Sequence, residues 1–237
     1  MHWCLGMRSS GSTWIFNVVR KVAAVMAPDR SILAPYVVLG SELPDLPDPA
    51  HLIIVKSHET DEIAAAALHK HADVIWISVR DPRDCVASLV QHHQVEFGAA
   101  LEQVRRDARY CVRFVSDRKA RLFRYESGFI DNPTTVGRIA AGFGGVLSVA
   151  DRDRIFAETR RPVIEAFIRQ LDRLPTTCRP APNDLVDLVT QWHSHHANRT
   201  GESGRWRSLL TPRQVVAIEQ CLPDWMHSFA YRAELTA

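Results

Sequence analysis

The sequence predicts an α/β fold in three layers, in which helices flank a central parallel β-sheet. Short runs of apolar and β-branched residues alternate along the chain with longer segments whose apolar residues recur every three or four positions. Strands and helices that alternate in this way build parallel sheets with helices on both faces. Polar clusters directly follow three of the short runs, at the strand ends where such sheets bind ligands.

The bulk composition is that of an ordinary globular chain. Of the 237 residues, 46% are hydrophobic and 24% are charged, which is enough apolar material for one sizeable core. We therefore expect a single domain over residues 1–237. The formal net charge of +2 gives no sign of a nucleic-acid partner, because such partners select strongly basic surfaces. No stretch of about 18 apolar residues occurs, so we expect no membrane span.

Two further features concern the cellular compartment. The five cysteines are odd in number and form no C-x-x-C pair, which favours reduced thiols over disulfides or a zinc site. The chain enters its first strand without a basic segment followed by a long apolar run, so we expect no signal peptide. Together these observations favour a cytoplasmic protein.

The expected elements follow from periodicity, caps and prolines. Thr60 and the pair Asp81-Pro82 are helix-start signals, and Thr211-Pro212 repeats the second pattern near the C-terminus. Three prolines within residues 175–182 predict a linker. We expect strands at residues 3–5, 51–55, 73–79 and 120–125, and helices at residues 15–26, 61–71, 99–117, 133–143, 160–174 and 184–196.

The loop after the first strand, residues 6–13, reads Gly-Met-Arg-Ser-Ser-Gly-Ser-Thr. A strand, a glycine-flanked loop and a helix direct several backbone N–H groups and the positive helix end toward one point, which suits a phosphate or a sulfate. The spacing is that of the nucleotide phosphate loop (P-loop), with Ser12 where kinases and GTPases carry a lysine. That lysine neutralises the β- and γ-phosphates, so its absence points to another phosphate donor or to no reaction. A plain strand–helix turn is the alternative interpretation.

Five motifs follow one another along the chain: Arg8-Ser9-Ser10-Gly11-Ser12-Thr13-Trp14, Lys56-Ser57-His58, Arg80-Asp81-Pro82-Arg83-Asp84 with Ser88, Arg124-Tyr125-Glu126 before Asp131-Asn132-Pro133, and Arg199 with Gly201, Gly204 and Trp206. In this order and spacing they resemble the motifs of the sulfotransferases that use 3′-phosphoadenosine 5′-phosphosulfate (PAPS). The resemblance covers nearly the whole chain. It implies a P-loop-type three-layer fold and transfer of a sulfuryl group from PAPS to a hydroxyl or amine of a small-molecule, saccharide or lipid acceptor. The nucleotide product is adenosine 3′,5′-bisphosphate (PAP), and the chemistry requires no metal ion.

The resemblance also implies which residues hold the nucleotide. The loop amides with Ser12 and Thr13 would hold the 5′-phosphate, and Trp14 would stack near the adenine. Arg80 and Ser88 would hold the 3′-phosphate, because a long guanidinium can lean along two turns of helix. The full set of cofactor-binding candidates is Arg8, Ser9, Ser10, Gly11, Ser12, Thr13, Trp14, Arg80, Ser88, Tyr125, Arg199, Thr200 and Gly201.

The catalytic candidates are His58, Lys56 and Arg8. His58 is the expected general base, since an attacking hydroxyl must lose its proton and histidine titrates near neutral pH. Glu59 is the alternative base. Lys56 lies two residues before His58, on the same side of a strand, and would stabilise the sulfonate or the leaving oxygen. The family's loop lysine aligns with Ser9, so Arg8 is the expected substitute, although arginine differs from lysine in shape.

Two other functions stay open. A P-loop kinase for small molecules is disfavoured by the missing loop lysine, whereas Ser9 favours a catalytically weak nucleotide-binding protein of the same fold. The histidines at positions 92, 93, 193, 195 and 196 match no recognised ligand spacing, so we expect a solvated or partner-facing patch rather than a metal site. The sequence leaves open the identity of the acceptor and the oligomeric state, a homodimer included.

Overall fold

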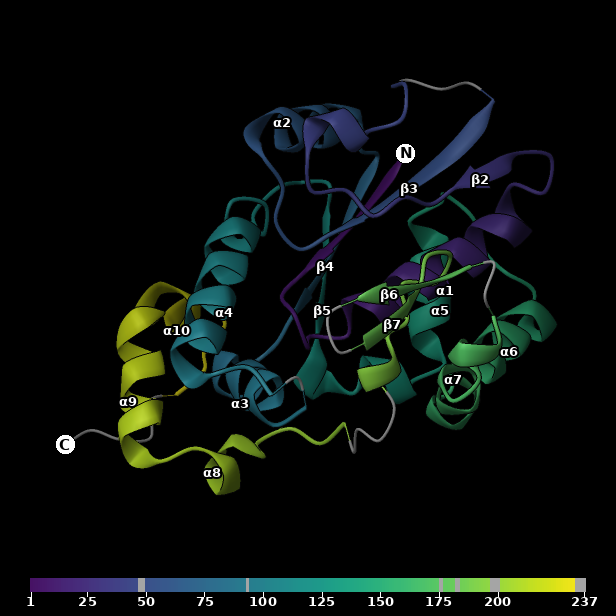
Figure 1. Ribbon diagram of the computed structural model, residues 1–237. Coiled ribbons are helices and arrows are strands. Elements are labelled where there is room, and N and C mark those ends of the chain that lie inside the picture. Colours follow the sequence, from purple (N-terminus) through teal and green to yellow (C-terminus); the bar gives the residue numbers. More distant parts are fainter. Residues whose placement is uncertain (47–49, 93, 175–176, 182–183, 197–200, 233–237) are drawn as a thin grey trace.

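The computed structural model describes residues 1–46, 50–92, 94–174, 177–181, 184–196 and 201–232, and a parallel sheet forms its centre (Figure 1). The strands stand in the order β2-β3-β1-β4-β5, and every neighbouring pair is parallel. The strands are β1 (His2–Gly6), β2 (Ser31–Leu33), β3 (His51–Ser57), β4 (Val74–Val79) and β5 (Ala120–Arg124). The predicted α/β fold class is therefore confirmed.

Strand β1 lies where the order of the strands reverses. It pairs with β3 on one side and with β4 on the other, so that Leu5 lies between Ser57 and Ile77. Ligands of open parallel sheets bind beyond the carboxyl ends of the strands at such a switch point. In this chain those ends belong to β1, β3 and β4.

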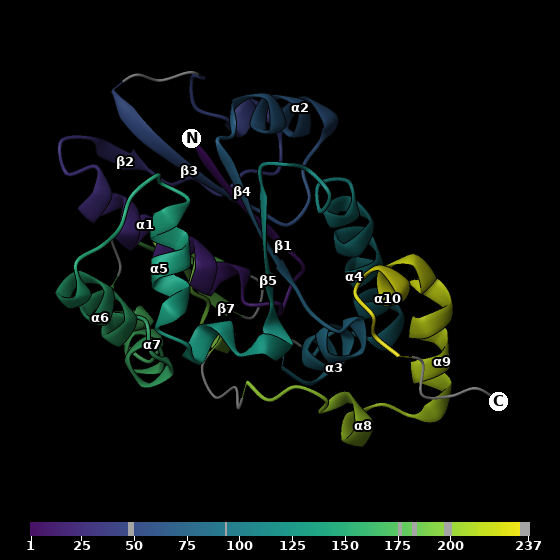
Figure 2. The ribbon, with the colours of Figure 1, turned by 180° about the vertical axis from the view of Figure 1, so that it is seen from behind.

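The α-helices cover both faces of the sheet. In Figures 1 and 2, α1, α5, α6 and α7 lie on one side, whereas α2, α3, α4, α9 and α10 lie on the other. A separate antiparallel hairpin, β6 (Cys178–Ala181) with β7 (Asp184–Asp187), lies beside α1. The helices are α1 (Ser12–Met26), α2 (Glu62–His71), α3 (Pro82–His92), α4 (Phe97–Val112), α5 (Thr134–Ala141), α6 (Val149–Glu158), α7 (Arg161–Ile168), α8 (Trp206–Leu209), α9 (Pro212–Cys221) and α10 (Pro223–Ser228).

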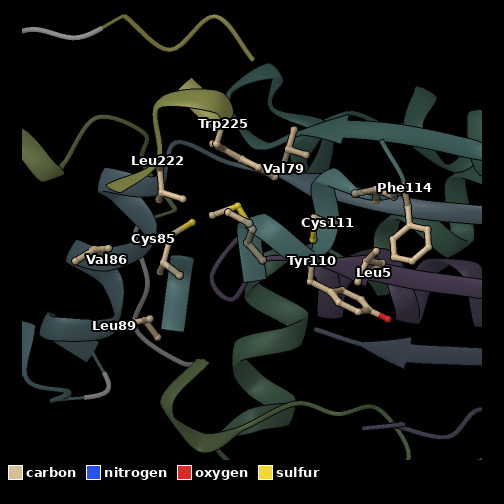
Figure 3. Close-up of a cluster of buried hydrophobic side chains, with 14 of the residues drawn as sticks. Leu5, Val79, Cys85, Val86, Leu89, Tyr110, Cys111, Phe114, Leu222 and Trp225 are labelled. Carbon is tan, nitrogen blue, oxygen red and sulfur yellow. The ribbon is translucent and has the colours of Figure 1, made fainter. Parts of the chain in front are cut away.

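The side chains of the strands alternate between the two helical layers. On β1, Trp3 packs with buried residues of α2, α3 and α4, while Cys4 packs with those of α1 and α5. On β4, Ile75 and Trp76 divide in the same way. Figure 3 shows the first layer, in which side chains of β1, β4, α3, α4 and α10 meet. Both faces of the sheet are therefore buried, which explains why its strands are almost continuously apolar.

Most predicted elements are present, with shifted ends. Helix α1 ends at Met26, just before Pro28 as predicted. Asp61 rather than Thr60 caps α2, because the Asp61 carboxylate accepts the N–H of Ala64. The short strand β2 and the helix α6 have no predicted counterpart.

The predicted helix over residues 184–196 is wrong. The segment forms β7 and a short 3₁₀ turn (Ser194–His196) instead. The Asp187 carboxylate accepts both the N–H and the hydroxyl of Thr190, and such local bonds compete with helix formation. Gln191 has a φ of 58°, in the left-handed region that ends regular helices.

Two neighbouring predictions also need correction. The expected linker over residues 175–182 contains β6, and Pro180 fits there because the two-stranded sheet leaves backbone groups that need no ladder partner. The helix predicted over residues 160–174 ends earlier, at Ile168, and a 3₁₀ turn (Leu171–Arg173) follows it.

The thiols and the helix lengths complete the description. All five cysteines are free thiols. Burial raises the pKa of Cys85 and Cys111 well above the ordinary value, which keeps both thiols protonated and unreactive. Within the described ranges, no helix is both long and apolar enough to cross a membrane.

Gly142 tests the packing of α5 on the sheet. A Cβ atom at this position would lie 2.1 Å from the Trp76 ring, and Trp76 is fully buried. We expect Gly142→Ala to lower the free energy of unfolding by about 1–3 kcal/mol, the usual cost of overpacking a core. Urea unfolding measures this change.

Gly137 on the same helix provides the matched control, because no atom lies within 4 Å of a Cβ built there. Gly137→Ala should leave the protein equally stable or up to about 1 kcal/mol more stable, through helix propensity alone. Equal effects of the two substitutions would contradict the packing described here.

Candidate active site

A cleft of about 990 Å³ opens beyond the carboxyl ends of β1, β3 and β4. It brings together most of the residues that the sequence singled out. Ser10 does not line it, and Arg199 and Thr200 lie outside the described residues. The predicted residues that line the cleft are Arg8, Ser9, Gly11, Ser12, Thr13, Trp14, Lys56, His58, Arg80, Ser88, Tyr125 and Gly201.

The loop from Gly6 to Gly11 forms one end of the cleft. Helix α1 begins directly after it at Ser12, so the N–H groups of its first turn have no partner within the helix. Gly11 has a φ of 85°, which glycine adopts without strain. The Ser10 hydroxyl lies behind the loop, where it donates to the Met7 carbonyl at 2.6 Å and contacts the Ser78 hydroxyl at 2.6 Å. The Ser10 side chain thus ties the loop to β4, and the N–H groups available to a ligand are those at the start of α1.

Gly6 lets the loop approach the sheet closely. A Cβ atom at Gly6 would lie 2.1 Å from the Ser78 hydroxyl, which any larger residue would displace. The buried Ser9 hydroxyl has no hydrogen-bond partner within the described part of the chain. Together with the N–H groups at the start of α1, this hydroxyl supplies hydrogen-bond donors of the kind that an anion site uses.

Lys56 and His58 follow one another along the end of β3 and meet in the cleft. The His58 Nδ1 atom lies 2.6 Å from the Gly6 carbonyl oxygen. A carbonyl only accepts hydrogen bonds, so Nδ1 carries the proton and donates it. The other ring nitrogen, Nε2, therefore has the lone pair, and the Lys56 Nζ atom lies 3.3 Å from it. This tautomer is the one that a general base requires.

Burial, and then neighbouring positive charges, shift the pKa values of Lys56 and His58 downward. Burial, and secondly the charge on Arg8, lower the pKa of Lys56 to about 7. Burial, and then the charges on Lys56 and Arg8, lower the pKa of His58 well below its ordinary value. His58 is consequently neutral at pH 7, with the lone pair on Nε2.

Arg8 is anchored by a residue that the sequence did not reveal. The Arg8 backbone N–H donates to Asp107 on α4 at 2.9 Å, and the Arg8 guanidinium forms an ion pair with the same carboxylate. Asp107 is fully buried, and burial raises its pKa. Sequence analysis missed Asp107 because it lies among arginines at helical spacing, a pattern typical of a solvated face.

Arg80 links the loop of residues 6–11 to the C-terminal loop that contains Glu202. Its guanidinium donates to the carbonyl oxygens of Ser9 at 2.8 Å and Glu202 at 3.0 Å. It also lies over the Tyr125 ring, 4.0 Å from the centroid, and the Tyr125 hydroxyl donates to the Gly201 carbonyl. The Arg80 Nε atom is buried without a partner among the described residues.

Two further observations concern predicted site residues. Trp14 reaches the cleft from a buried position, in which its indole N–H donates to the Thr159 carbonyl at 2.8 Å. Its contact with an adenine stays a prediction. Glu59, the alternative base, is not among the described residues that line the cleft, and its carboxylate lies 3.9 Å from the guanidinium of Arg106.

The histidine-rich segment lines the same cleft. His193 and His195 both contact the Asp184 carboxylate, and the three groups place their ligand atoms within 4.8 Å of one another. A helix over residues 184–196, as the sequence predicts, would not bring Asp184 to these histidines. A strand and a return turn were needed to bring them together.

The lowered pKa of Lys56 predicts a pH dependence of stability. Between its folded value of about 7 and the unfolded value of 10.5, the unfolded chain binds a proton that the folded chain lacks. The free energy of unfolding therefore rises with pH between about pH 7 and 10.5. Below about pH 7 the folded and unfolded chains both bind the proton, so this increase is absent there. In Lys56→Met the slope should fall by up to about 1.4 kcal/mol per pH unit, as measured by urea unfolding between pH 7 and 10.

Lys70 is the control, because it is an exposed lysine on α2. Lys70→Met should leave the slope unchanged. If the wild-type protein and Lys56→Met show parallel profiles, Lys56 does not titrate in this window.

Comparison with solved structures shows which known proteins have the same fold. No protein-family model and no curated protein matches the sequence. The crystal structure of mouse sulfotransferase SULT7A1 complexed with PAP matches with a TM-score of 0.65 and 16% identity, over 95% of this chain and 83% of that chain. The structure of retinol dehydratase in complex with androsterone and inactive cofactor PAP matches with a TM-score of 0.61 and 16% identity. The structure of retinol dehydratase in a complex with retinol and PAP matches with a TM-score of 0.60 and 15% identity. Each match covers 100% of this chain and 82% of the other chain. The chain thus has the fold of the mouse sulfotransferase and of retinol dehydratase.

Proposed function

We propose that this protein transfers a sulfuryl group from PAPS to a hydroxyl or amine of a small-molecule, saccharide or lipid acceptor. The observation that carries the proposal is the position of neutral His58. Its Nε2 lone pair lies beside Lys56 in the same cleft as the loop that precedes α1. A base, a cation and a phosphate site in one cleft are the parts that the reaction needs.

The loop end of the cleft suits the 5′-phosphosulfate. The first amides of α1 and the hydroxyls of Ser9, Ser12 and Thr13 supply hydrogen-bond donors, and the helix end supplies positive potential. The solved structures with the same fold were crystallised with PAP, which supports a nucleotide of this kind.

The 3′-phosphate is proposed to bind between Arg80 and Ser88. The buried Arg80 Nε atom has no partner in the described chain, so one charged donor is available without breaking a contact. Ser88 lies two turns along α3 and lines the same wall. Tyr125 and Gly201 are joined by a hydrogen bond beside Arg80 and close this end.

The proposed transfer is an in-line displacement at sulfur. His58 Nε2 takes the proton as the acceptor oxygen or nitrogen forms its bond to sulfur, and the bond from sulfur to the phosphate oxygen breaks. Lys56 and Arg8 would stabilise the charge that develops on this leaving oxygen, which departs with PAP. The proton then passes from His58 to solvent.

One observation favours a second candidate, a nucleotide-binding protein with weak or no transfer. Ser9 replaces the loop lysine of the resembling family, and Arg8 is already paired with Asp107. If neither Arg8 nor Lys56 reaches the leaving oxygen, PAP would bind and transfer would be slow. The two experiments below separate binding from transfer.

Nucleotide binding is tested by calorimetric titration with PAP, AMP and ATP. PAP should bind with a micromolar Kd, and AMP, which lacks the 3′-phosphate, should bind far more weakly. Arg80→Ala and Ser88→Ala should each raise the Kd for PAP about tenfold to a hundredfold, because each removes a hydrogen bond to a charged group.

Arg109→Ala is the control for charge alone, since Arg109 is exposed on α4 and does not line the described cleft. Its Kd for PAP should stay within twofold of the wild-type value. Preference for ATP with Mg²⁺ over PAP would overturn the proposal in favour of a kinase.

The base is tested by following PAP release from PAPS in the presence of a panel of phenols, sterols, fatty alcohols and saccharides. His58→Ala should lower turnover with any accepted compound by about 10²–10⁴-fold, while the Kd for PAP stays within threefold. Glu59→Gln should retain turnover. Loss in Glu59→Gln with retention in His58→Ala would assign the base to Glu59, and tight PAP binding without turnover in the wild type would favour the second candidate.

A further inference from the structure

Asp184, His193 and His195 form a cluster in the wall of the cleft. Their ligand atoms all lie within 4.8 Å of one another, and all three residues are half-buried. Strand β7 begins at Asp184, and a bridge between Val186 and His193 returns the chain alongside it. The hairpin brings the histidines back to the carboxylate, although nine and eleven residues separate them.

The Asp184 carboxylate has one oxygen that is fully held and one that faces the histidines. Its Oδ1 atom accepts the N–H of Leu185 at 2.9 Å, the hydroxyl of Ser194 and the N–H of His195 at 3.3 Å. Its Oδ2 atom accepts the Nδ1–H groups of His193 and His195, each at 2.6 Å.

Two imidazole nitrogens and one carboxylate oxygen are a donor set that zinc and related divalent metals take in proteins. The bonds to Oδ1 orient the carboxylate in the way that outer hydrogen bonds orient metal ligands. His196 supports the arrangement from the other side, because its Nδ1 atom accepts the N–H of His193. The ligands are thus held in place by groups that do not themselves bind the ion.

The spacing of the cluster suits an ion after a small adjustment. Two ligand atoms that each lie about 2 Å from a tetrahedral zinc ion are roughly 3.3 Å apart. The nitrogens now lie 2.6 Å from Oδ2, as hydrogen-bonded partners do. An ion would therefore lengthen each nitrogen–oxygen distance by less than about 1 Å and replace the two protons that now lie between nitrogen and oxygen.

We propose that Asp184, His193 and His195 bind one divalent transition-metal ion, of the zinc class, with an open coordination position toward the cleft. Three protein ligands leave a fourth position free, as in zinc sites that bind a water or a substrate atom. The site lies in the same cleft as the nucleotide loop, but its occupation does not depend on sulfuryl transfer.

The test is a calorimetric titration of the untagged, EDTA-treated full chain with ZnCl₂ in the absence of nucleotide. One ion should bind per chain with a micromolar or lower Kd. Asp184→Asn and His195→Gln should each raise this Kd at least tenfold, whereas His227→Asn, which removes an exposed histidine on α10, should not. Co²⁺ in place of Zn²⁺ should give a visible absorption spectrum that both cluster variants lose.

Several outcomes would overturn the proposal. The wild-type chain could bind no Zn²⁺ at submillimolar concentration, or Asp184→Asn could bind Zn²⁺ with the wild-type Kd. Alternatively, His227→Asn could raise the Kd for Zn²⁺ as much as the cluster variants do. Cooperative urea unfolding checks that each variant is folded, and His195→Gln, which keeps the carboxylate and its bonds to Leu185 and Ser194, carries the comparison if Asp184→Asn unfolds. Because no nucleotide is present, a failure of PAP to bind leaves this result unaffected.

Discussion

Strand β1 is hydrogen-bonded to β3 on one side and to β4 on the other, and all three strands run in the same direction. Their ends must therefore meet at one edge, and these ends carry the loop, the pair Lys56 and His58, and Arg80. The close approach of the loop at Gly6 keeps this junction tight. Burial at the junction in turn depresses the pKa of Lys56, so the pairing of three strands determines the chemistry of one lysine.

The fold was predictable where local signals and long-range packing agree. Strands β3 and β4 are apolar runs because both faces of the sheet are buried, and each is followed by a capped helix. The helix predicted over residues 184–196 is wrong because the apolar residues recur with helical spacing, whereas side-chain hydrogen bonds within the segment favour turns. A single-sequence pattern records hydrophobic spacing but not which of two local hydrogen-bonding arrangements has the lower energy.

The candidate site was predictable where its residues are contiguous in sequence. Arg80 lies just before α3 and Ser88 lies within it, while Lys56 and His58 lie at the end of β3. Their spacing in the sequence therefore predicts that the members of each pair are close in space. Asp107 meets Arg8 across 99 residues, and Asp184 meets two histidines only through a hairpin. Such contacts depend on tertiary packing, and neither Asp107 nor Asp184 belongs to a sequence motif that predicts its role.

The guanidinium of Arg80 already holds the carbonyl oxygens of Ser9 and Glu202. Under the proposed function, a 3′-phosphate that binds here would compete for the same N–H groups, so part of its binding would be an exchange of hydrogen bonds rather than a gain. Its release would let these N–H groups return to the two carbonyl oxygens. Under the proposed function, the affinity for the nucleotide product would therefore also depend on how firmly one guanidinium holds the first loop to the C-terminal loop.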